Sequence, residues 1–229
     1  LYTGFDPAGS TIGPSDGYSF KMGTIVAASG DVYIPHSIFH YVIRVTPDGK
    51  GFDQNPYAGG LGLSAYKDGL RRTEARFQEP VAVTRGPDGA LYVCDAGNFV
   101  IRRVPIENPA VGEAAKVTTF AGSGQKGRES GKARFARFGI LDTAAFDPDG
   151  NAFVLDSKVN HAVRQVSKAG QVFTVAGGAG EGVRDGIGRQ AEFGDARFLQ
   201  RAPDGTLYVV DRTGPRGTYY LKTIKPANR

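Results

Sequence analysis

Three aspartates occupy equivalent positions in the sequence and are its most regular candidates for chemistry. Asp95, Asp156 and Asp211 each end a short apolar run, and Asn98 and Asn160 follow the first two. Carboxylates that ring a channel could bind a cation. Each aspartate also precedes a turn, where Asp and Asn side chains form hydrogen bonds with nearby backbone groups. We therefore interpret all five residues as structural turn caps and expect no metal site.

The three histidines are sharper candidates, because two of them replace residues of that turn. His36 and His40 stand in a related segment at the positions of the aspartate and the asparagine, and His161 directly follows Asn160. Imidazole nitrogens bind zinc, but a structural zinc site takes about four ligands. No cysteine or further histidine completes such a set. We expect His36, His40 and His161 to contact a ligand without a metal.

Basic residues gather in three long glycine-rich segments, 59–76, 122–137 and 177–197. Those that we expect to contact a ligand are Arg71, Arg72, Lys126, Arg128 and Arg184. Acidic residues interrupt the same segments, so solvated side chains with local ion pairs are the alternative interpretation. The net charge of +5 permits an anionic partner without requiring one. A carboxylated or sulfated glycan, a phosphate or an acidic protein would suit these segments.

Other motifs for catalysis or cofactor binding are weak. Residues 122–127 spell G-x-G-x-x-G, but a dinucleotide site needs a following helix in a βαβ unit, and none is predicted. The only cysteine, Cys94, lies in an apolar run and is expected to be a core residue. No Gly-x-Ser-x-Gly motif is present. We assign no catalytic residue and expect no cofactor.

A repeated phrase explains how these residues are positioned. Its leading phenylalanines, Phe20, Phe77, Phe138 and Phe193, are separated by 57, 61 and 55 residues. Each copy runs through a turn, usually Pro-Asp-Gly, to an apolar run and the aspartate, and in the looser first copy Ile43-Arg44 aligns with Ile101-Arg102. A repeat of this length indicates a solenoid, a propeller or an array.

The strands predicted within each copy select the propeller. In the second copy they are 81–83, 91–93, 100–104 and 117–120, and in the third copy 143–146, 152–155, 162–166 and 172–175. Four short antiparallel strands followed by a long glycine-rich loop form one propeller blade. No segment shows sustained helical periodicity, which disfavours helical solenoids. We predict an all-β propeller of four-stranded antiparallel blades.

Strand order sorts the loops onto two faces. In an up-and-down blade, the turn between the second and third strands shares one face with the long loop to the next blade. This long-loop face collects all three histidines and the basic segments, so we expect the binding site there. The other face carries short turns such as Pro-Asp-Gly, and we expect it to offer little to bind with.

The second and third copies resemble the NHL repeat. The phrase F-x-x-P-x-x-[VI], PDG-x-LYV-x-D, N-x-x-IR-x-[VI] and T-x-AG-x-G carries the resemblance, in the long-looped form of bacterial secreted and surface proteins. The resemblance implies a six-bladed, TolB-like propeller whose relatives often carry an IPT/TIG domain. It also implies an extracytoplasmic location at the bacterial envelope or cell surface. The first copy departs from the pattern at His36 and His40, and the last departs after Asp211.

The whole chain, 1–229, is expected to form one propeller domain. Its repeats span approximately 17–60, 70–122, 131–177 and 186–229, and residues 1–4 look like a closing strand. Two arrangements stay open: a closed four-bladed ring, or the C-terminal part of a six-bladed propeller. The chain has neither an initiator methionine nor a leader segment, so it looks like a mature protein or an excised piece.

The function expected from these features is binding rather than catalysis. We predict a non-catalytic binding or scaffold module of a bacterial envelope or surface protein that binds a glycan or protein on the long-loop face. One alternative is a metal-dependent lyase or hydrolase with its site at the channel mouth, and another is a protein–protein scaffold only. Nucleic acid is not expected, because aromatic residues near basic ones occupy core positions. No run approaches the roughly 20 apolar residues of a membrane helix.

Overall fold

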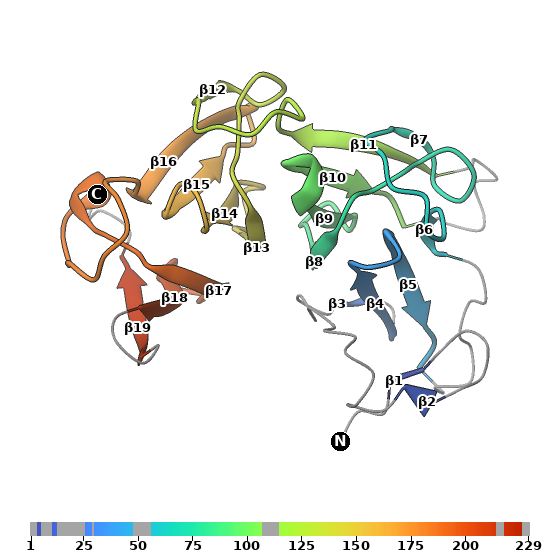
Figure 1. Ribbon diagram of the computed structural model, residues 1–229, viewed down its shortest axis with the longest axis horizontal. Coiled ribbons are helices and arrows are strands. Elements are labelled where there is room, and N and C mark those ends of the chain that lie inside the picture. The colour runs from blue at the N-terminus through green and yellow to red at the C-terminus, as the bar shows by residue number, and fades with distance from the viewer. Residues whose placement is uncertain are drawn as a thin grey trace.

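The described residues form an all-β propeller fold in which four antiparallel sheets follow one another along an open arc (Figure 1). The computed structural model describes residues 4–5, 11–12, 26–28, 30–47, 56–106, 115–213 and 218–225. Two short 3-10 turns, η1 (Ala96–Asn98) and η2 (Gly188–Gln190), are the helical segments of this part. Neither has the length or the apolar character needed to cross a membrane.

The second and third blades are the most complete. The second contains β7 (Gly69–Leu70), β8 (Pro80–Arg85), β9 (Leu91–Asp95), β10 (Val100–Val104) and β11 (Lys116–Ala121). The third contains β12 (Gly131–Lys132), β13 (Leu141–Phe146), β14 (Ala152–Asp156), β15 (Ala162–Val166) and β16 (Gln171–Gly177). All eight strands expected in these two copies are confirmed. The innermost strands β8 and β13 lie side by side.

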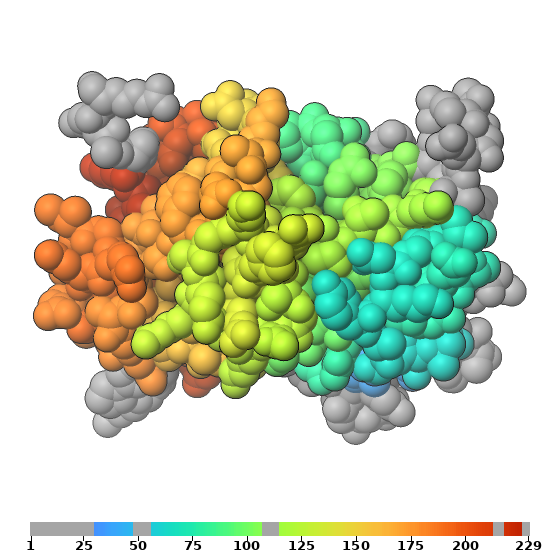
Figure 2. Space-filling model, turned by 90° about the horizontal axis from the view of Figure 1, so that it is seen from above, coloured from blue at the N-terminus to red at the C-terminus, as the bar shows by residue number. Residues whose placement is uncertain are grey.

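The short strands β7 and β12 were not expected from the sequence. Each has two residues inside a long loop, too few for an alternating apolar pattern to be visible. β7 pairs with β11 and β12 pairs with β16, so each long loop adds a fifth strand to the outer edge of its blade. Seen from above in Figure 2, these loops (cyan and yellow-green) cover the rim of the arc. An exposed edge strand is thereby partly paired.

The first and last blades are smaller. The first contains β3 (Val26–Ala28), β4 (Asp31–His36), β5 (Tyr41–Val45) and β6 (Ala58–Gly59), and the fourth contains β17 (Asp195–Arg201), β18 (Leu207–Thr213) and β19 (Thr218–Ile224). The arc is open between these two blades (Figure 1), so the described residues do not form a closed four-bladed ring. Their arrangement is that of part of a larger propeller.

The expected closing strand is described only at its last residue. Gly4 belongs to β1 (Gly4–Phe5), which pairs with β2 (Thr11–Ile12) and not with β19, while residues 1–3 lie outside the described part. The four repeat boundaries and the single-domain assignment stay predictions.

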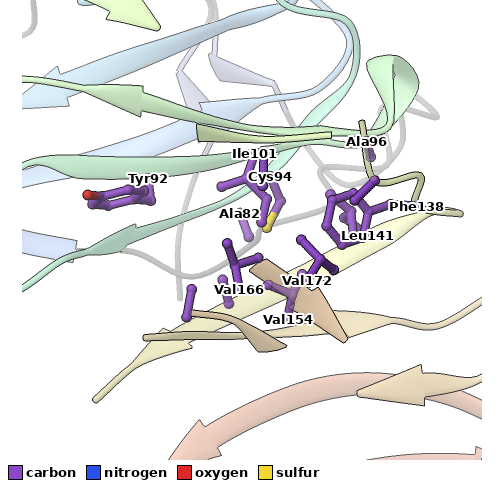
Figure 3. Packing of buried hydrophobic residues seen from close by; sticks show 14 of the residues in the cluster. Ala82, Tyr92, Cys94, Ala96, Ile101, Phe138, Leu141, Val154, Val166 and Val172 are labelled. Carbon is purple, nitrogen blue, oxygen red and sulfur yellow. The ribbon is translucent and has the colours of Figure 1, made fainter. Parts of the chain in front are cut away.

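The core lies between neighbouring blades. The leading phenylalanines Phe77, Phe138 and Phe193 are each at most 2% exposed and anchor three successive apolar clusters. Figure 3 shows Cys94 of the second blade pointing toward Leu141 and Val166 of the third. Burial raises the pKa of the Cys94 thiol, so it is a packing residue, as the sequence indicated.

Candidate functional site

A buried ion pair in the second blade shows what the recurring aspartate does. Arg102 of β10 and Asp95 of β9 are fully buried, with Nη1 and Oδ2 2.9 Å apart. Asp95 also accepts hydrogen bonds from the Asn98 side chain and from the Gln78 amide. Nη2 of Arg102 reaches the carboxylate of Asp68 at 2.6 Å. Two carboxylates therefore balance the Arg102 charge.

The third blade repeats the pair with weaker compensation. Arg164 is the counterpart of Arg102 in strand register, and its Nη1 lies 3.3 Å from Oδ2 of Asp156. Burial raises the pKa of Asp156 to about 6, as it does that of Asp95, against the hydrogen bonds from Asn160 and Arg164. Burial lowers the pKa of Arg164; Asp156 opposes that shift, and the positive charge of Arg189 adds to it. Arg164 is thus a buried cation with the positive charge of Arg189 and the smaller opposing effect of the Glu129 carboxylate in its surroundings.

The fourth blade holds a lysine at the same position. Lys222 of β19 pairs with Val209, as Arg102 pairs with its neighbour in β9. Its Nζ lies 3.7 Å from Asp211, which is fully buried and accepts hydrogen bonds from the Gly194 amide. All three strand-end aspartates therefore face a backbone amide and a cation, which is buried in the second and third blades and partly exposed in the fourth.

The first blade lacks this charge cluster. The register between β4 and β5 places Ile43 at the position of Arg102, so the sequence alignment of Arg44 with that arginine was one residue out. His36 takes the aspartate position, and its ring centroid lies 4.7 Å from that of Phe39. Burial lowers the pKa of His36. At the described positions equivalent to Asp95 and Arg102, the first blade therefore has His36 and Ile43 in place of the ion pair.

His40 and His161 occupy one common position, the residue before the third strand. Both have positive φ, 61° and 45°, and Phe39 rather than His40 stands at the asparagine position. Nδ1 of His40 accepts a hydrogen bond from the Glu79 amide at 3.1 Å, and Nδ1 of His161 lies 2.8 Å from the Gly194 carbonyl oxygen. Each imidazole therefore links its own blade to the residues just before the first long strand of the next blade.

A cleft of about 120 Å³ opens beside Arg164 on the long-loop face of the third blade. Arg128 and Arg189 reach it from the two long loops, and Thr174 and the turn that ends at His161 complete its walls. Both loop arginines are exposed, whereas Arg164 is only 1% exposed and forms the floor. Three arginines therefore line one small space.

No carboxylate is among the described residues that line this cleft. Glu129, which follows Arg128 in the sequence, has its carboxylate 3.5 Å from Arg137. Within the described part of the chain, neither Arg128 nor Arg189 forms an ion pair within 4.0 Å. The cleft is therefore positively charged and suited to a negatively charged group.

The structure brings together only some of the residues predicted to contact a ligand. Arg128 and His161 line the cleft, while Arg72 and Lys126 are exposed on the loops outside it. Arg184 pairs with Glu192 at 2.9 Å. His36 and His40 belong to the first blade, two blades away along the arc.

Arg71 lies in a different environment from the one expected. It is 2% exposed, and its guanidinium carbon lies 3.7 Å from the centre of the Tyr57 ring. It therefore packs inside the protein and is not part of an exposed basic face. A stacked arginine of this kind stabilises through cation–π contact and buried area.

The face that carries the short Pro-Asp-Gly turns contains two clefts that the sequence did not predict. Clefts of about 380 and 490 Å³ lie at the Pro-Asp-Gly turns of the second and third blades. The smaller one is lined by Tyr92, Phe120 and Phe146, whose ring centroids are 4.4 to 6.2 Å apart. These clefts, which several aromatic side chains line, were not expected on a face of short turns.

The enzyme alternative requires a histidine to meet Asp95 or Asp156 at the channel mouth. Both carboxylates are fully buried and engaged by an arginine, an asparagine and a backbone amide. Among the described residues, no group of three or more histidine, cysteine, aspartate or glutamate side chains could hold a metal ion. In the described part of the chain, no histidine therefore meets Asp95 or Asp156 in the way that this alternative requires.

Comparison with solved structures supports the propeller fold. An auxiliary nutrient binding protein from Bacteroides ovatus is 18% identical with a TM-score of 0.62, over 80% of this chain and 44% of that one. One from Bacteroides thetaiotaomicron is 17% identical with a TM-score of 0.60, over 79% and 42%. A gluconolactonase from Xanthomonas campestris is 15% identical with a TM-score of 0.50, over 82% and 52%.

These similarities show the fold alone, because sequence identity is below 25% in each case. The chain spans less than half the length of the two nutrient binding proteins. No protein-family model matches the chain, and no curated protein matches it. The resemblance to the NHL repeat therefore remains an interpretation of the sequence.

Proposed function

We propose that the chain is a non-catalytic binding module of a bacterial envelope or surface protein and holds a negatively charged polar ligand, such as an acidic glycan, on its long-loop face. The observation that carries the proposal is the cleft above Arg164. Arg128, Arg189 and Arg164 converge there, and no described carboxylate lines it. The binding site is the cleft itself, built on a rigid blade.

Charge supports an anionic ligand more strongly than a neutral one. Arginine presents planar, paired donors that suit carboxylate, sulfate or phosphate groups. Arg164 is held in place by Asp156 and by the Phe138 ring, whose centre lies 5.5 Å from the guanidinium carbon. A fixed cation at the floor with exposed cations at the rim gives both orientation and attraction.

The structural relatives support a role in ligand binding. Two of them are described as auxiliary nutrient binding proteins of Bacteroides. Together with the resemblance to long-looped NHL repeats, they favour a surface or periplasmic location. A lyase or hydrolase is the less favoured alternative, because the strand-end aspartates serve as buried partners of arginine and lysine. A scaffold without a small ligand would leave the cationic cleft unexplained.

The aromatic cleft on the short-turn face is a second candidate surface. Tyr92, Phe120 and Phe146 line it together with Asp88 and Lys168. Aromatic rings beside polar groups are suited to packing against sugar rings as well as apolar groups. This cleft would favour a neutral glycan and would function independently of the arginines.

Titration of a set of acidic and neutral oligosaccharides against wild type and variants tests the proposal. Arg189→Ala and Arg128→Ala should each weaken binding of an acidic oligosaccharide by about tenfold, since a charged hydrogen bond contributes about 1.5–3 kcal/mol. Arg184→Ala is the matched control, because it removes a loop arginine that is already paired with Glu192. Equal binding by all three variants would place the ligand elsewhere.

A further inference from the structure

The second blade shows which group the cleft of the third blade is missing. Nη2 of Arg102 bonds the Asp68 carboxylate and the carbonyl of the residue before it. Nη2 of Arg164 bonds the Ser130 hydroxyl and, likewise, the carbonyl of the preceding residue. Asp68 and Ser130 therefore occupy the same position in successive blades.

In the second blade this position is filled by a carboxylate with three donors. Asp68 accepts hydrogen bonds from Arg102 at 2.6 Å and from the amide and hydroxyl of Thr119 at 3.0 and 3.1 Å. Tyr66 covers the pair: its hydroxyl lies 3.0 Å from Oγ1 of Thr119, and the Arg102 guanidinium carbon lies 5.3 Å from its ring centre. The resident carboxylate and the ring therefore fill the position next to Arg102.

The third blade keeps the arginine and the threonine, but the acceptor is a neutral hydroxyl instead of a carboxylate. Thr174 pairs with Arg164 across the sheet just as Thr119 pairs with Arg102. Ser130 replaces the carboxylate, and its hydroxyl lies 3.2 Å from Nη2 of Arg164. Arg128 precedes Glu129 and Ser130 and takes the place of the covering tyrosine. The result is a cleft lined by the arginine and the threonine that are equivalent to those holding Asp68.

We propose that this cleft binds the carboxylate of its ligand in the position that Asp68 occupies in the second blade. The inference rests on the proposed function and names the group recognised. Arg164 and Thr174 would hold the carboxylate at the floor, and Arg128 and Arg189 would approach it from the rim. The charge of Arg164 would then be balanced by two carboxylates, as that of Arg102 is.

The size of the cleft limits what enters it. Its volume of about 120 Å³ is well below the roughly 300–1,000 Å³ of pockets that enclose whole small molecules. It therefore takes one charged group and the atoms that carry it, while the rest of the ligand lies along the loops. A carboxylate on a sugar ring, as in a uronic acid, is the form that follows from the proposed function.

A single substitution can supply the missing group from the protein. Ser130→Asp places a carboxylate where Asp68 stands, and Ser130→Asn is a matched control of nearly the same size without the charge. The assay is calorimetric titration of the 229-residue chain with sodium D-glucuronate, with D-glucose and sodium sulfate as comparison ligands. A second variant, Arg128→Tyr, copies the covering ring and does not depend on the behaviour of Ser130→Asp.

We expect wild type to bind glucuronate and to prefer it over both glucose and sulfate. Ser130→Asp should raise the melting temperature and weaken glucuronate binding by about tenfold or more, which corresponds to about 1.4 kcal/mol or more. Ser130→Asn should retain more of the affinity, and Arg128→Tyr should lose it. Failure of wild type to bind glucuronate, or undiminished binding by Ser130→Asp and Arg128→Tyr, would overturn the proposal.

The results separate this inference from the proposed function. If acidic oligosaccharides need Arg189 but bind Ser130→Asp as well as wild type, the binding module stands and the carboxylate position is wrong. If sulfate binds better than glucuronate, the group is wrong although the cleft is right. If an aspartate-containing peptide binds and glucuronate does not, the proposal that a sugar carries the carboxylate is wrong. If the affinity for acidic oligosaccharides is unchanged in all the arginine variants, the proposed function itself is contradicted.

Discussion

Removing the strand-end aspartate should cost more stability in the third blade than in the second. Asp95→Ala and Asp156→Ala each remove hydrogen bonds to one arginine, one asparagine and one backbone amide. After Asp95→Ala, Arg102 still has Asp68 at 2.6 Å. After Asp156→Ala, Arg164 has no carboxylate within 4.0 Å among the described residues; Glu129 acts on it only at longer range, and the charge of Arg189 opposes it.

The magnitude follows from the partners that remain. Breaking a buried ion pair by removing one partner costs about 3–5 kcal/mol, because it leaves an uncompensated buried charge. A remaining hydrogen bond to a charged group is worth about 1.5–3 kcal/mol. We therefore expect Asp156→Ala to lower the free energy of unfolding by about 5 kcal/mol and Asp95→Ala by about 2–3 kcal/mol.

Urea denaturation at pH 7, followed by circular dichroism, measures both values against wild type. Asp149→Ala, which removes an exposed aspartate of a turn, is the control and should change stability by less than about 0.5 kcal/mol. An equal or larger loss in Asp95→Ala would refute the reasoning, since it would mean that Asp68 contributes nothing to balancing Arg102.

Three further outcomes follow from the described contacts. Burial lowers the pKa of His36 below its usual value of 6.5, so its contribution to stability is present above that pH and is lost as the pH falls through the folded-state pKa; His36→Phe should flatten the decline in melting temperature between pH 7 and 5. Phe138→Ala should cost about 3–5 kcal/mol in urea denaturation, because the side chain is fully buried between two blades. Gly177→Ala should lower the melting temperature more than Gly170→Ala: both glycines have positive φ, 78° and 74°, but only at Gly177 would a Cβ collide with a backbone carbonyl.

The repeat in the sequence was enough to predict the blades. Turn chemistry and short β-rich runs recur with the same spacing, so each copy supports the others, and strands such as β10 and β15 coincide with their predicted bounds. The fifth strands β7 and β12 were missed because two residues carry no periodic signal.

The candidate site was only partly predictable. Arg128 and His161 were identified from loop position and residue type, whereas Arg164 was assigned to a strand and not to a site. A charged residue in the middle of an apolar strand signals a buried partner, and its recurrence at Arg102 and Arg164 carried that signal. The loss of the second carboxylate at Ser130 could be recognised only after hydrogen bonds established which loop residues are equivalent.

The most direct measurement is nuclear magnetic resonance of the arginine side chains and backbone amides during titration with sodium D-glucuronate. If the cleft is a carboxylate site, the Nε–H signal of Arg164 and the amide of Thr174 should shift in a saturable way, and the Nε–H signal of Arg102 should not move. Shifts confined to residues outside the cleft, or equal shifts at Arg102 and Arg164, would contradict the account.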